Sequence, residues 1–366
     1  MNLHSFAYFI SPHGFGHAAR ASAVMNALHN KLPGINFEIY TSVPEWFFRD
    51  SCIAPFNYHY LVCDVGLVQK TATIQDLDET LIRLAQLYPV HDSLRSNLKQ
   101  ELLEAKCCGI ICDISPLGIE IADSIGIPSF LVENFTWDWI YEEYKTSHKG
   151  FSKYIKHLKR SFGKASYHIQ TEPVCESSEK ALFVPPISRL PKHSRSETRS
   201  SLEVYDNQKL VLITMGGVYD TINISPKIKS FKECVFILPG SNQTFLRENN
   251  VIYLSYHSNF YHPDLVSAAD AVIGKAGYST LAEIFYAAVP FGYVKRENFR
   301  ESPILEKFIK DKMKGICIPK DDFETDKWLN RLADIVNIKL ASRVQQRGND
   351  RVADFVLDSL DIQLTG

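Results

Sequence analysis

The sequence lacks any long hydrophobic run. Among its 366 residues there is no stretch of about 18 consecutive apolar residues, the length that a membrane-spanning helix needs. The N-terminus also lacks a basic segment followed by a long apolar core, because it leads directly into an apolar stretch of strand length at 6–10. We therefore expect neither a transmembrane segment nor a secretory signal.

Cysteine is present, but without the spacing of a metal site or a disulfide framework. The eight cysteines are scattered, and the group Cys107, Cys108 and Cys112 has no second cluster and no histidine partner with which to bind zinc. Unpaired cysteines are typical of a reducing compartment. We therefore expect a cytoplasmic protein that needs no metal and no other cofactor.

Charge of one sign is not in excess. The formal net charge is −2, which gives no general reason to expect nucleic-acid binding. One segment is locally basic, and its charged residues are Lys145, Lys149, Lys153, Lys156, Lys159, Arg160 and Lys164. We interpret this segment as the solvated face of a helix; peripheral contact with a membrane surface or an anionic acceptor molecule is the alternative.

The composition, with 45% hydrophobic and 22% charged residues, is that of a globular chain long enough for two domains. In the first half, short β-rich stretches alternate with helical patterns, which predicts a parallel sheet covered by helices on both faces. A long helical stretch is expected over 74–105, and a lysine-rich helix after Trp137. Strands are expected at 6–10, 36–41, 58–63, 109–113 and 129–132.

A change of composition after Val184 indicates a domain boundary. Proline is frequent over 185–191 and a Ser/Arg-rich run continues to Ser201, so we expect 185–205 to be a linker. A second alternating series has strands expected at 209–214, 234–238, 251–254, 271–273, 291–294 and 315–318. We therefore predict two doubly wound α/β domains, 1–184 and 206–345, that face each other across a ligand cleft at the carboxyl ends of their sheets. A final helix within 346–366 is expected to pack back on the first domain.

A glycine turn flanked by two histidines is the most informative motif of the first half. His13, Gly14, Gly16 and His17 join the strand at 6–10 to the helix that follows. Bare backbone amides at a helix start suit an anion or a closely approaching ligand. The helix dipole disfavours the protonated form of His17, which suits a general base. An ordinary strand-to-helix connection is the alternative, and a metal site at the two histidines lacks a third ligand.

Further candidates for the same site follow other strands of the first domain. Asp113 ends an apolar strand and could orient His17, as a buried carboxylate does for a catalytic histidine; capping of the next helix is the alternative. Asn134 and Trp137 lie in an aromatic-rich segment that could stack on a ligand, with core packing as the alternative. Asp64 is either a ligand contact or a turn former.

A second amide-rich motif lies in the second domain, where it follows the strand at 271–273 and opens a helix. It consists of Gly274, Lys275, Gly277, Tyr278, Ser279 and Thr280. Amides and hydroxyls in this arrangement can hold a diphosphate. One turn further, Glu283 has the reach to accept hydrogen bonds from the hydroxyls of a ribose.

Two polar loops complete this second constellation. The loop after the strand at 291–294 contains Asn298, Arg300 and Glu301, whose side chains can bind the hydroxyls of a sugar. Gly216 and Gly217 follow the strand at 209–214 and are either a ligand-binding loop or a plain turn at the end of a strand.

Taken in order, these motifs resemble those of glycosyltransferases with the GT-B fold. The series from Gly274 through Glu283 to Pro290 resembles their donor-nucleotide region, and the turn at 14–17 resembles their acceptor-side loop. A closer resemblance is to the glycosyltransferase-like N-terminal half of plant L-arabinokinases. It is carried by the segments 14–18, 63–66, 134–138 and 289–291, and it extends to about Ser359.

This resemblance implies a GT-B fold of two Rossmann-like domains, with the acceptor bound by 1–184 and a nucleotide-diphosphate sugar, expected to be a UDP-sugar, by 206–345. His17 would deprotonate a hydroxyl of an unknown acceptor, with inversion at the anomeric carbon. No metal is expected, because helix-start amides can stabilise the leaving group and no Asp-x-Asp is placed like that of a metal-dependent donor site. His13, Gly14, Gly16, Asp64, Asn134 and Trp137 would lie on the acceptor side, and Gly216 and Gly217 in the donor loop.

The sequence departs from these relatives in two respects. The sugar-kinase half of the L-arabinokinases has no counterpart here, so kinase activity is not expected. Arg300 and Glu301 replace an Asp-Gln pair that is common in the sugar-contacting loop, which leaves the donor sugar open. Two alternatives remain: a hydrolase, similar to the nucleotide-sugar hydrolase of the pseudaminic acid pathway, and a non-catalytic nucleotide-sugar-binding module.

Overall fold

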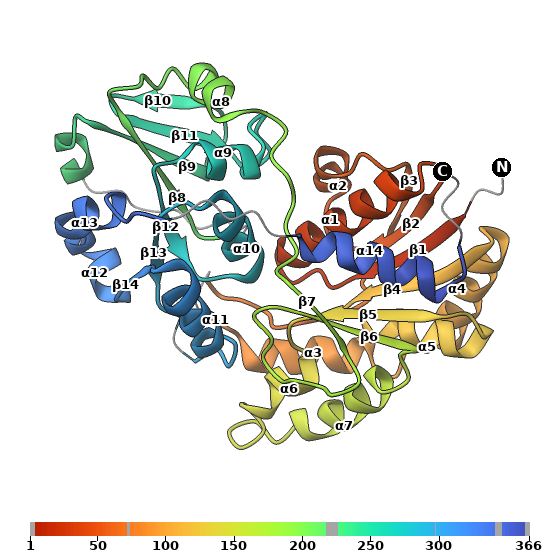
Figure 1. Ribbon diagram of the computed structural model, residues 1–366. Coiled ribbons are helices and arrows are strands. Elements are labelled where there is room, and N and C mark those ends of the chain that lie inside the picture. Colours follow the sequence, from red (N-terminus) through yellow and green to blue (C-terminus); the bar gives the residue numbers. More distant parts are fainter. Residues whose placement is uncertain (1–3, 72–73, 217–225, 297, 341–345, 363–366) are drawn as a thin grey trace. The chain divides into compact units, whose positions relative to one another are not determined.

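The computed structural model describes residues 4–71, 74–216, 226–296, 298–340 and 346–362, and the chain divides into two compact units (Figure 1). Unit 1 takes in the described residues up to Lys70, those of 74–188, and those from Gln346 onward. Unit 2 takes in Thr71 and the described part of 189–345. Each unit has its own sheet and its own core, as the two-domain prediction requires.

Unit 1 is built on a seven-stranded sheet with the order β3-β2-β1-β4-β5-β6-β7, in which every pairing is parallel. Its strands are β1 (Ser5–Ile10), β2 (Asn36–Thr41), β3 (Phe56–Tyr60), β4 (Cys107–Asp113), β5 (Ser129–Glu133), β6 (Tyr167–Thr171) and β7 (Leu182–Val184). Its helices are α1 (Gly16–Lys31), α2 (Glu45–Ser51), α3 (Leu77–Leu87), α4 (Asp92–Glu104), α5 (Pro116–Ile125), α6 (Trp137–Glu142), α7 (Phe151–Phe162) and α14 (Gly348–Ser359).

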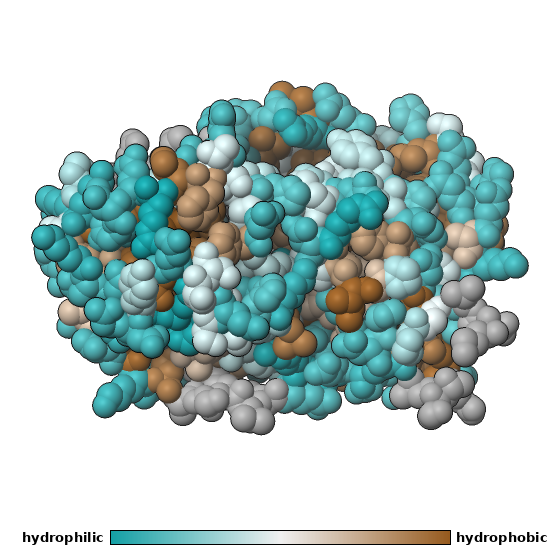
Figure 2. Space-filling view, turned by 90° about the horizontal axis from the view of Figure 1, so that it is seen from above, coloured by the Kyte–Doolittle hydropathy of each residue, from teal (hydrophilic) through white to brown (hydrophobic). Residues whose placement is uncertain are grey.

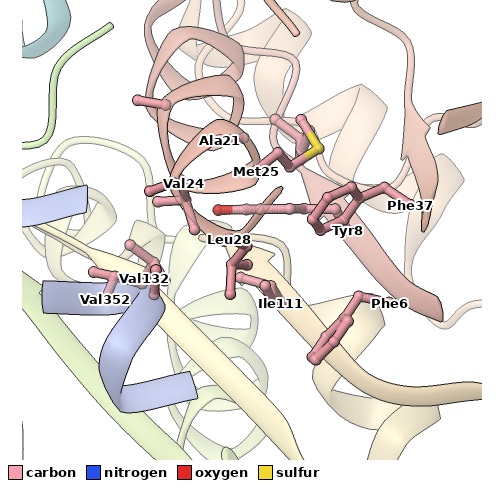
Figure 3. Packing of buried hydrophobic residues seen from close by; sticks show 14 of the residues in the cluster. Phe6, Tyr8, Ala21, Val24, Met25, Leu28, Phe37, Ile111, Val132 and Val352 are labelled. Atoms are coloured by element: carbon pink, nitrogen blue, oxygen red, sulfur yellow. The ribbon is translucent and has the colours of Figure 1, made fainter. Parts of the chain in front are cut away.

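The core of unit 1 explains why its strands are apolar on both sides. On one face of the sheet, Tyr8 and Ile111 pack against Val24 and Leu28 of α1 (Figure 3). The last helix, α14, adds Val352 to the same cluster and packs along α1, although more than 300 residues separate the two helices in the sequence. Helix α5 packs against β4 and β5, whose remaining apolar side chains are also buried. Full burial of one such side chain contributes about 1.5–3 kcal/mol to folding.

Three details of unit 1 differ from the sequence predictions. Strand β3 ends at Tyr60 and not at 63, because its only partner, β2, ends at Thr41. The helical stretch 74–105 is two helices, α3 and α4, because Pro89 between them has no N–H to donate to a helical hydrogen bond. Strands β6 and β7 were not predicted.

Unit 2 has a second seven-stranded sheet, with the order β10-β11-β9-β8-β12-β13-β14, in which only the β10–β11 pair is antiparallel. Its strands are β8 (Lys209–Thr214), β9 (Cys234–Asn242), β10 (Leu246–Glu248), β11 (Val251–Ser255), β12 (Ala271–Lys275), β13 (Phe291–Val294) and β14 (Ile316–Ile318). Its helices are α8 (Arg195–Ser201), α9 (His262–Ala268), α10 (Tyr278–Ala287), α11 (Ser302–Phe308), α12 (Lys320–Glu324) and α13 (Leu332–Val336), with single helical turns η1 (Pro226–Ser230), η2 (Ile309–Met313) and η3 (Lys327–Arg331).

Apolar clusters cover both faces of this second sheet. Leu212 and Val272 face a cluster that contains Leu281 of α10. Val211 and Ile273 face the opposite cluster, which includes Trp328 of η3. The prediction of two doubly wound α/β domains is thus confirmed.

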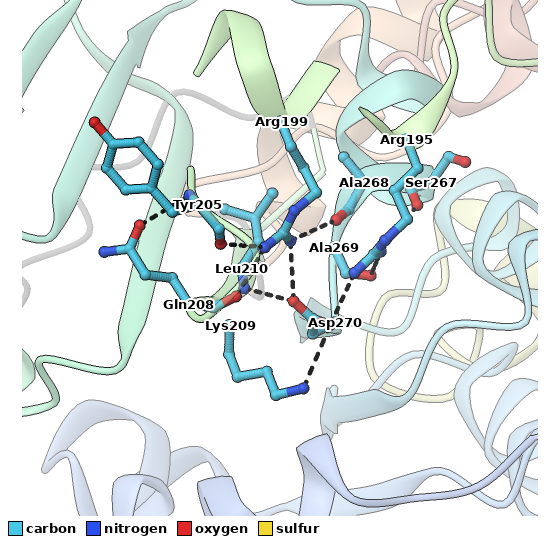
Figure 4. A network of polar contacts seen from close by, with 10 residues as sticks. All are labelled: Arg195, Arg199, Tyr205, Gln208, Lys209, Leu210, Ser267, Ala268, Ala269 and Asp270. Atoms are coloured by element: carbon cyan, nitrogen blue, oxygen red, sulfur yellow. Dashed lines mark hydrogen bonds and ion pairs between the residues drawn. The ribbon is translucent and has the colours of Figure 1, made fainter. Parts of the chain in front are cut away.

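Helix α8 lies in the segment 185–205, where we expected a linker. Ser194 and Glu197 form a capping box at its start, a sequence signal that the polar composition obscured. Arg199 is buried and donates hydrogen bonds to Asp270 (3.1 Å) and to the carbonyl of Gln208 (2.7 Å) (Figure 4). These contacts, with those of Arg195 to Asp270 and to the carbonyl of Ala269, hold α8 on unit 2, so its arginines are structural.

The surface seen in Figure 2 is largely hydrophilic, with apolar residues in small separate groups. Of the helices in the described part of the chain, none combines the length and the apolar character that crossing a bilayer requires.

Candidate functional site

The first candidate site lies where the connections of the unit 1 sheet change direction. Strands β1 and β4 are neighbours, but β1 leads through α1 to β2 on one side and β4 leads through α5 to β5 on the other. At such a switch point the two loops at the carboxyl ends diverge and leave room for a ligand. His17 lies in the first turn of α1 beyond β1, and Asp113 ends β4, so both residues lie at this point.

His17 and Asp113 are joined by a hydrogen bond between their side chains. Nδ1 of His17 lies 2.7 Å from Oδ1 of Asp113, and both side chains are buried. Because Nδ1 is engaged with the carboxylate, Nε2 is the ring nitrogen that can take a proton from a ligand.

Arg20 completes this cluster. Its Nε donates to Oδ2 of Asp113 (2.7 Å) and its Nη2 donates to Oδ1 (2.6 Å), so the two side chains form a bidentate ion pair. Arg20 itself is only 1% exposed. Its Nη1 donates to Oδ1 of Asn134 (2.8 Å). The sequence analysis did not identify Arg20, although its spacing of three residues from His17 on one helix places both side chains on the same face.

The electrostatics of the cluster favour an ionised Asp113 and a neutral His17. Burial raises the pKa of Asp113, but Arg20 and His17 outweigh it, so that this pKa is below its ordinary value. Burial is also the largest effect on His17 and lowers its pKa; the bond to Asp113 opposes this change, and Arg20 adds to it. A neutral imidazole held by a carboxylate is suited to accept a proton near pH 7.

Further predicted residues lie in or against the loop from β1 to α1. Trp137, the first residue of α6, is fully buried and donates a hydrogen bond from Nε1 to Oγ of Ser11 in this loop (3.3 Å). Its ring centroid lies 5.1 Å from that of His13 and 6.1 Å from that of His17. Gly14 has a φ of +71°, a backbone conformation that favours glycine. A Cβ at this position would have no atom within 4 Å, so the space next to Gly14 is open. Gly16 is the first residue of α1, and no acidic side chain lies in the first turn.

Asp64 lies in the loop after β3 and is almost completely buried. Its Oδ1 accepts a hydrogen bond from the amide of Val65 (2.8 Å), while Oδ2 accepts none within the described residues. Burial raises the pKa of Asp64 to about 7, although hydrogen bonding with Ser11 lowers it in part. Asp64 is therefore a second titratable group next to the β1–α1 loop.

The second candidate site lies at the corresponding point of the unit 2 sheet. Strands β8 and β12 are neighbours, and the connections that leave them run to opposite sides. Helix α10 begins directly beyond β12, with Gly277 at its N-cap position and no side chain bonded to that cap. Three residues around the start of this helix are partly exposed, namely Lys275, Gly277 and Ser279, whereas Tyr278 and Thr280 are buried. A ligand can therefore reach the positive end of the helix dipole at the partly exposed residues.

Lys275 reaches across to the end of β8. A Cβ at Gly216 would lie 3.5 Å from Cε and 3.8 Å from Nζ of Lys275. Burial lowers the pKa of Lys275 to about 7, and the nearby Arg296 lowers it further, while Glu301 opposes the change. The guanidinium of Arg296 is stacked 3.7 Å from the ring centroid of Phe299. Two cationic groups therefore lie beside the start of α10.

The other residues predicted for this site have different environments. A Cβ at Gly274 would lie 2.0 Å from the carbonyl oxygen of Thr214, so glycine is required there for strand packing. In the loop after β13, Asn298 is exposed, Arg300 is half-buried, and Glu301 is buried at the N-cap position of α11. Gly217 lies outside the described residues.

Glu283 is buried on α10 and bonded on both oxygens. Oε1 accepts from Nε (3.0 Å) and Nη2 (2.8 Å) of Arg189, and Oε2 lies 2.7 Å from Nδ1 of His262. Burial raises the pKa of this carboxyl, but Arg189 and His262 outweigh it and lower the pKa overall. Neither partner was foreseen, because Arg189 lies in the segment that we expected to be a linker.

Metal ligands do not gather in the described part of the chain: it contains no group of three or more His, Cys, Asp or Glu side chains arranged to hold a metal ion.

Two Rossmann-like units in one chain, each with a candidate site at the switch point of its parallel sheet, are the architecture of the GT-B class. Solved glycosyltransferases share this fold. One is the glycotransferase of kitacinnamycin, with a TM-score of 0.64 and 14% identity over 98% of this chain and 100% of that one. Another is UGT89C1 of Arabidopsis thaliana in complex with UDP, with a TM-score of 0.65 and 11% identity over 98% and 99% of the two chains.

A relative is also found by sequence similarity. The chain is 26% identical over 343 residues to the L-arabinokinase of Arabidopsis thaliana, and the match covers 91% of this chain. The match covers only 32% of the length of that relative. No protein-family profile matches the chain. The resemblance to GT-B glycosyltransferases, inferred from the motifs, is confirmed by the solved structures, and the resemblance to L-arabinokinase is confirmed by the sequence match.

Proposed function

We propose that this protein is a glycosyltransferase that moves a sugar from a nucleotide-diphosphate sugar, with UDP as the nucleotide, to a hydroxyl group of an acceptor. The observation that carries the proposal is the bond between His17 and Asp113 at the switch point of the unit 1 sheet. A buried, neutral histidine held by an ionised carboxylate is the arrangement that a general base requires.

In the proposed reaction, Nε2 of His17 takes the proton of the acceptor hydroxyl. The hydroxyl oxygen then forms a bond to the anomeric carbon of the donor sugar as the bond to the diphosphate breaks, and the nucleoside diphosphate leaves. Attack opposite the leaving group inverts the anomeric carbon. Asp113 stabilises the imidazolium that forms, and Arg20 keeps Asp113 ionised.

Unit 2 supplies the proposed donor site. The start of α10, with Gly277 and Ser279, and the cationic Lys275 and Arg296 would stabilise the negative charge of the departing diphosphate. These groups do the work that a divalent cation does in metal-dependent enzymes, so we propose a metal-independent reaction.

Two further donor contacts belong to the proposal. Glu283 would bind the ribose hydroxyls; because its oxygens already accept from Arg189 and His262, the ribose would have to use their remaining lone pairs. Asn298, Arg300 and Glu301 would contact the sugar, and the positive charge of Arg300 in place of the aspartate of the Asp-Gln pair would alter which donor sugar is preferred.

A panel of nucleotide sugars tests the proposed function. The purified protein is incubated with each of them, without and with mixtures of hydroxyl acceptors, while thermal unfolding and nucleotide release are followed together. A bound donor at a hundredfold excess over its Kd stabilises the folded protein by about 2.7 kcal/mol. We expect at least one UDP-sugar to raise the unfolding temperature, with rapid UDP release only when an acceptor is added.

The other outcomes separate the alternatives. Rapid release without acceptor that disappears in His17→Ala would identify a hydrolase. Stabilisation without release under any condition would favour a binding module. No stabilisation by any nucleotide sugar would contradict the donor site.

The pKa of Lys275 gives a prediction for donor binding. A diphosphate diester attracts the protonated form of Lys275, whose pKa is about 7 in the free protein. We therefore expect the affinity for UDP-glucose, a diester without a titrating phosphate, to fall by up to about tenfold per pH unit above pH 7. Calorimetric titrations at pH 6.5, 7.5 and 8.5 measure this slope.

Two variants control this measurement. Lys275→Gln should bind more weakly and with a flatter pH profile, whereas Lys295→Gln, which removes an exposed charge from the end of β13, should keep the slope. An unchanged slope in Lys275→Gln would show that another group titrates.

A further inference from the structure

Helix α7 carries the strongest local charge that the proposed function does not use. From 144 to 171 the sequence contains seven Lys and Arg residues and no Asp or Glu. The structure places this segment over α7, its two flanking turns and strand β6, with all seven cations on α7 and the turns (Figure 1). Phe151, Tyr154, Leu158 and Phe162 are buried, so the opposite side of the helix is the solvent side.

Four cations form a stripe on this solvent side, which we call the α7 basic face: Lys149, Lys153, Lys156 and Arg160. The spacings of three and four residues keep Lys153, Lys156 and Arg160 on one line along the helix, and Lys149 lies in the turn that leads into it. All four are exposed, and none has an ion-pair partner within the part of the chain that the structure describes. The pairs that do form lie at the ends of the segment, where Lys145 bonds Glu142 and Lys164 bonds Asp123.

The position of the stripe makes its charge available to a partner. The chain as a whole has a formal net charge of −2, so a general attraction to anions does not exist and any attraction is confined to this face. The helix and its N-terminal turn span roughly 20 Å, which lets the four cations contact an extended anionic surface simultaneously. The large aromatic residues of α7 are all buried, so the face offers no ring on which a nucleic-acid base could stack.

We propose that the α7 basic face binds the surface of a bilayer that contains anionic lipids. The contact is electrostatic and superficial, because the exposed side of α7 carries no large apolar side chain to insert between the lipids. Unit 1 is therefore the part of the protein that meets the bilayer, and the orientation of the protein on the bilayer follows from α7.

Vesicle co-sedimentation of the full chain tests this proposal. The vesicles are phosphatidylcholine alone, or phosphatidylcholine with about one-third phosphatidylglycerol. We expect binding only to the anionic vesicles, and loss of that binding at an ionic strength of about 1 M, where charges are screened within about 3 Å. Each exposed cation near an anionic bilayer contributes about fivefold to the affinity, so replacing all four with glutamine should weaken binding by at least about 100-fold.

A matched variant removes the same number of exposed cations, all of them lysines, from unit 2, and it should bind the vesicles as the wild type does: Lys307→Gln, Lys310→Gln, Lys312→Gln and Lys314→Gln. Both variants should unfold at the wild-type temperature, because all the replaced side chains are exposed. The proposal is overturned if the wild type fails to bind anionic vesicles at low salt, or if both variants weaken binding equally. Tighter binding to single-stranded RNA than to vesicles would also overturn it, because the face would then serve a different polyanion.

Discussion

Replacing His17 with alanine is expected to lower kcat about 100- to 10,000-fold, the contribution of a positioned general base. The donor should still bind, because the proposed donor site lies in unit 2. Turnover is measured as acceptor-dependent nucleotide release, and donor binding is measured separately by thermal unfolding. Since burial holds the pKa of His17 below its ordinary value of 6.5, the decrease of wild-type kcat/KM on the acidic side should begin below pH 6.5; the decrease above pH 7 belongs to donor binding by Lys275.

The matched control for this variant is His29→Ala, which makes the same substitution in the last turn of the same helix. It should retain wild-type turnover. Full turnover in His17→Ala would rule out His17 as the base, whereas an equal loss in both variants would indicate damage to α1.

Replacing Arg20 with methionine is expected to lower the free energy of unfolding by about 3–5 kcal/mol at pH 7. The cation is 1% exposed and makes two hydrogen bonds to the fully buried Asp113, so its removal leaves a buried negative charge that keeps the hydrogen bond to His17 but has lost its cationic partner. Urea unfolding followed by circular dichroism measures the loss. Arg49→Met, which removes an exposed arginine paired with Glu45 in the same unit, should cost less than about 1 kcal/mol.

The pH dependence of the Arg20→Met variant has a definite sign. Without Arg20, only the hydrogen bond and charge of His17 oppose the effect of burial on Asp113, so we expect the pKa of Asp113 to be higher in the folded variant than in the unfolded chain, and the folded variant to bind a proton that the unfolded chain does not. Its stability should therefore rise relative to the wild type as the pH falls from 7 towards 4. The double variant Arg20→Met/Asp113→Asn has no buried charge at this position and should be more stable than Arg20→Met at pH 7. A deficit that is independent of pH and unchanged in the double variant would assign the loss to packing.

Much of the fold follows from sequence periodicity. The strands at 36–41, 209–214 and 291–294 have the predicted ends, because apolar runs in buried parallel strands are bounded by clear turn residues. The errors arise where a partner or a single residue decides the structure. The end of β3 depends on where β2 stops, and Pro89 divides the helical stretch 74–105.

The candidate sites show the same contrast between local and long-range features. The turn at 14–17 and the start of α10 are each made by consecutive residues, so both could be predicted from the sequence. The partners of these motifs are set by the tertiary fold: Arg20 bonds Asn134 from 114 residues away, and Arg189 bonds Glu283 from 94 residues away. No local pattern encodes such distances, so the ion pairs that set the charge of Asp113 and Glu283 became apparent only in the structure.

The return of α14 to unit 1 has a consequence for the order in which the chain can fold during synthesis. Unit 2 is continuous in the sequence apart from Thr71 and is complete once residue 345 has been made. Unit 1 is discontinuous, since Val352, Val356 and Leu357 belong to the same core as Val24 and Leu28. On the ribosome, the side of α1 that packs against α14 therefore stays uncovered until unit 2 and the residues after it have been synthesised. The part of the protein made first is the part completed last.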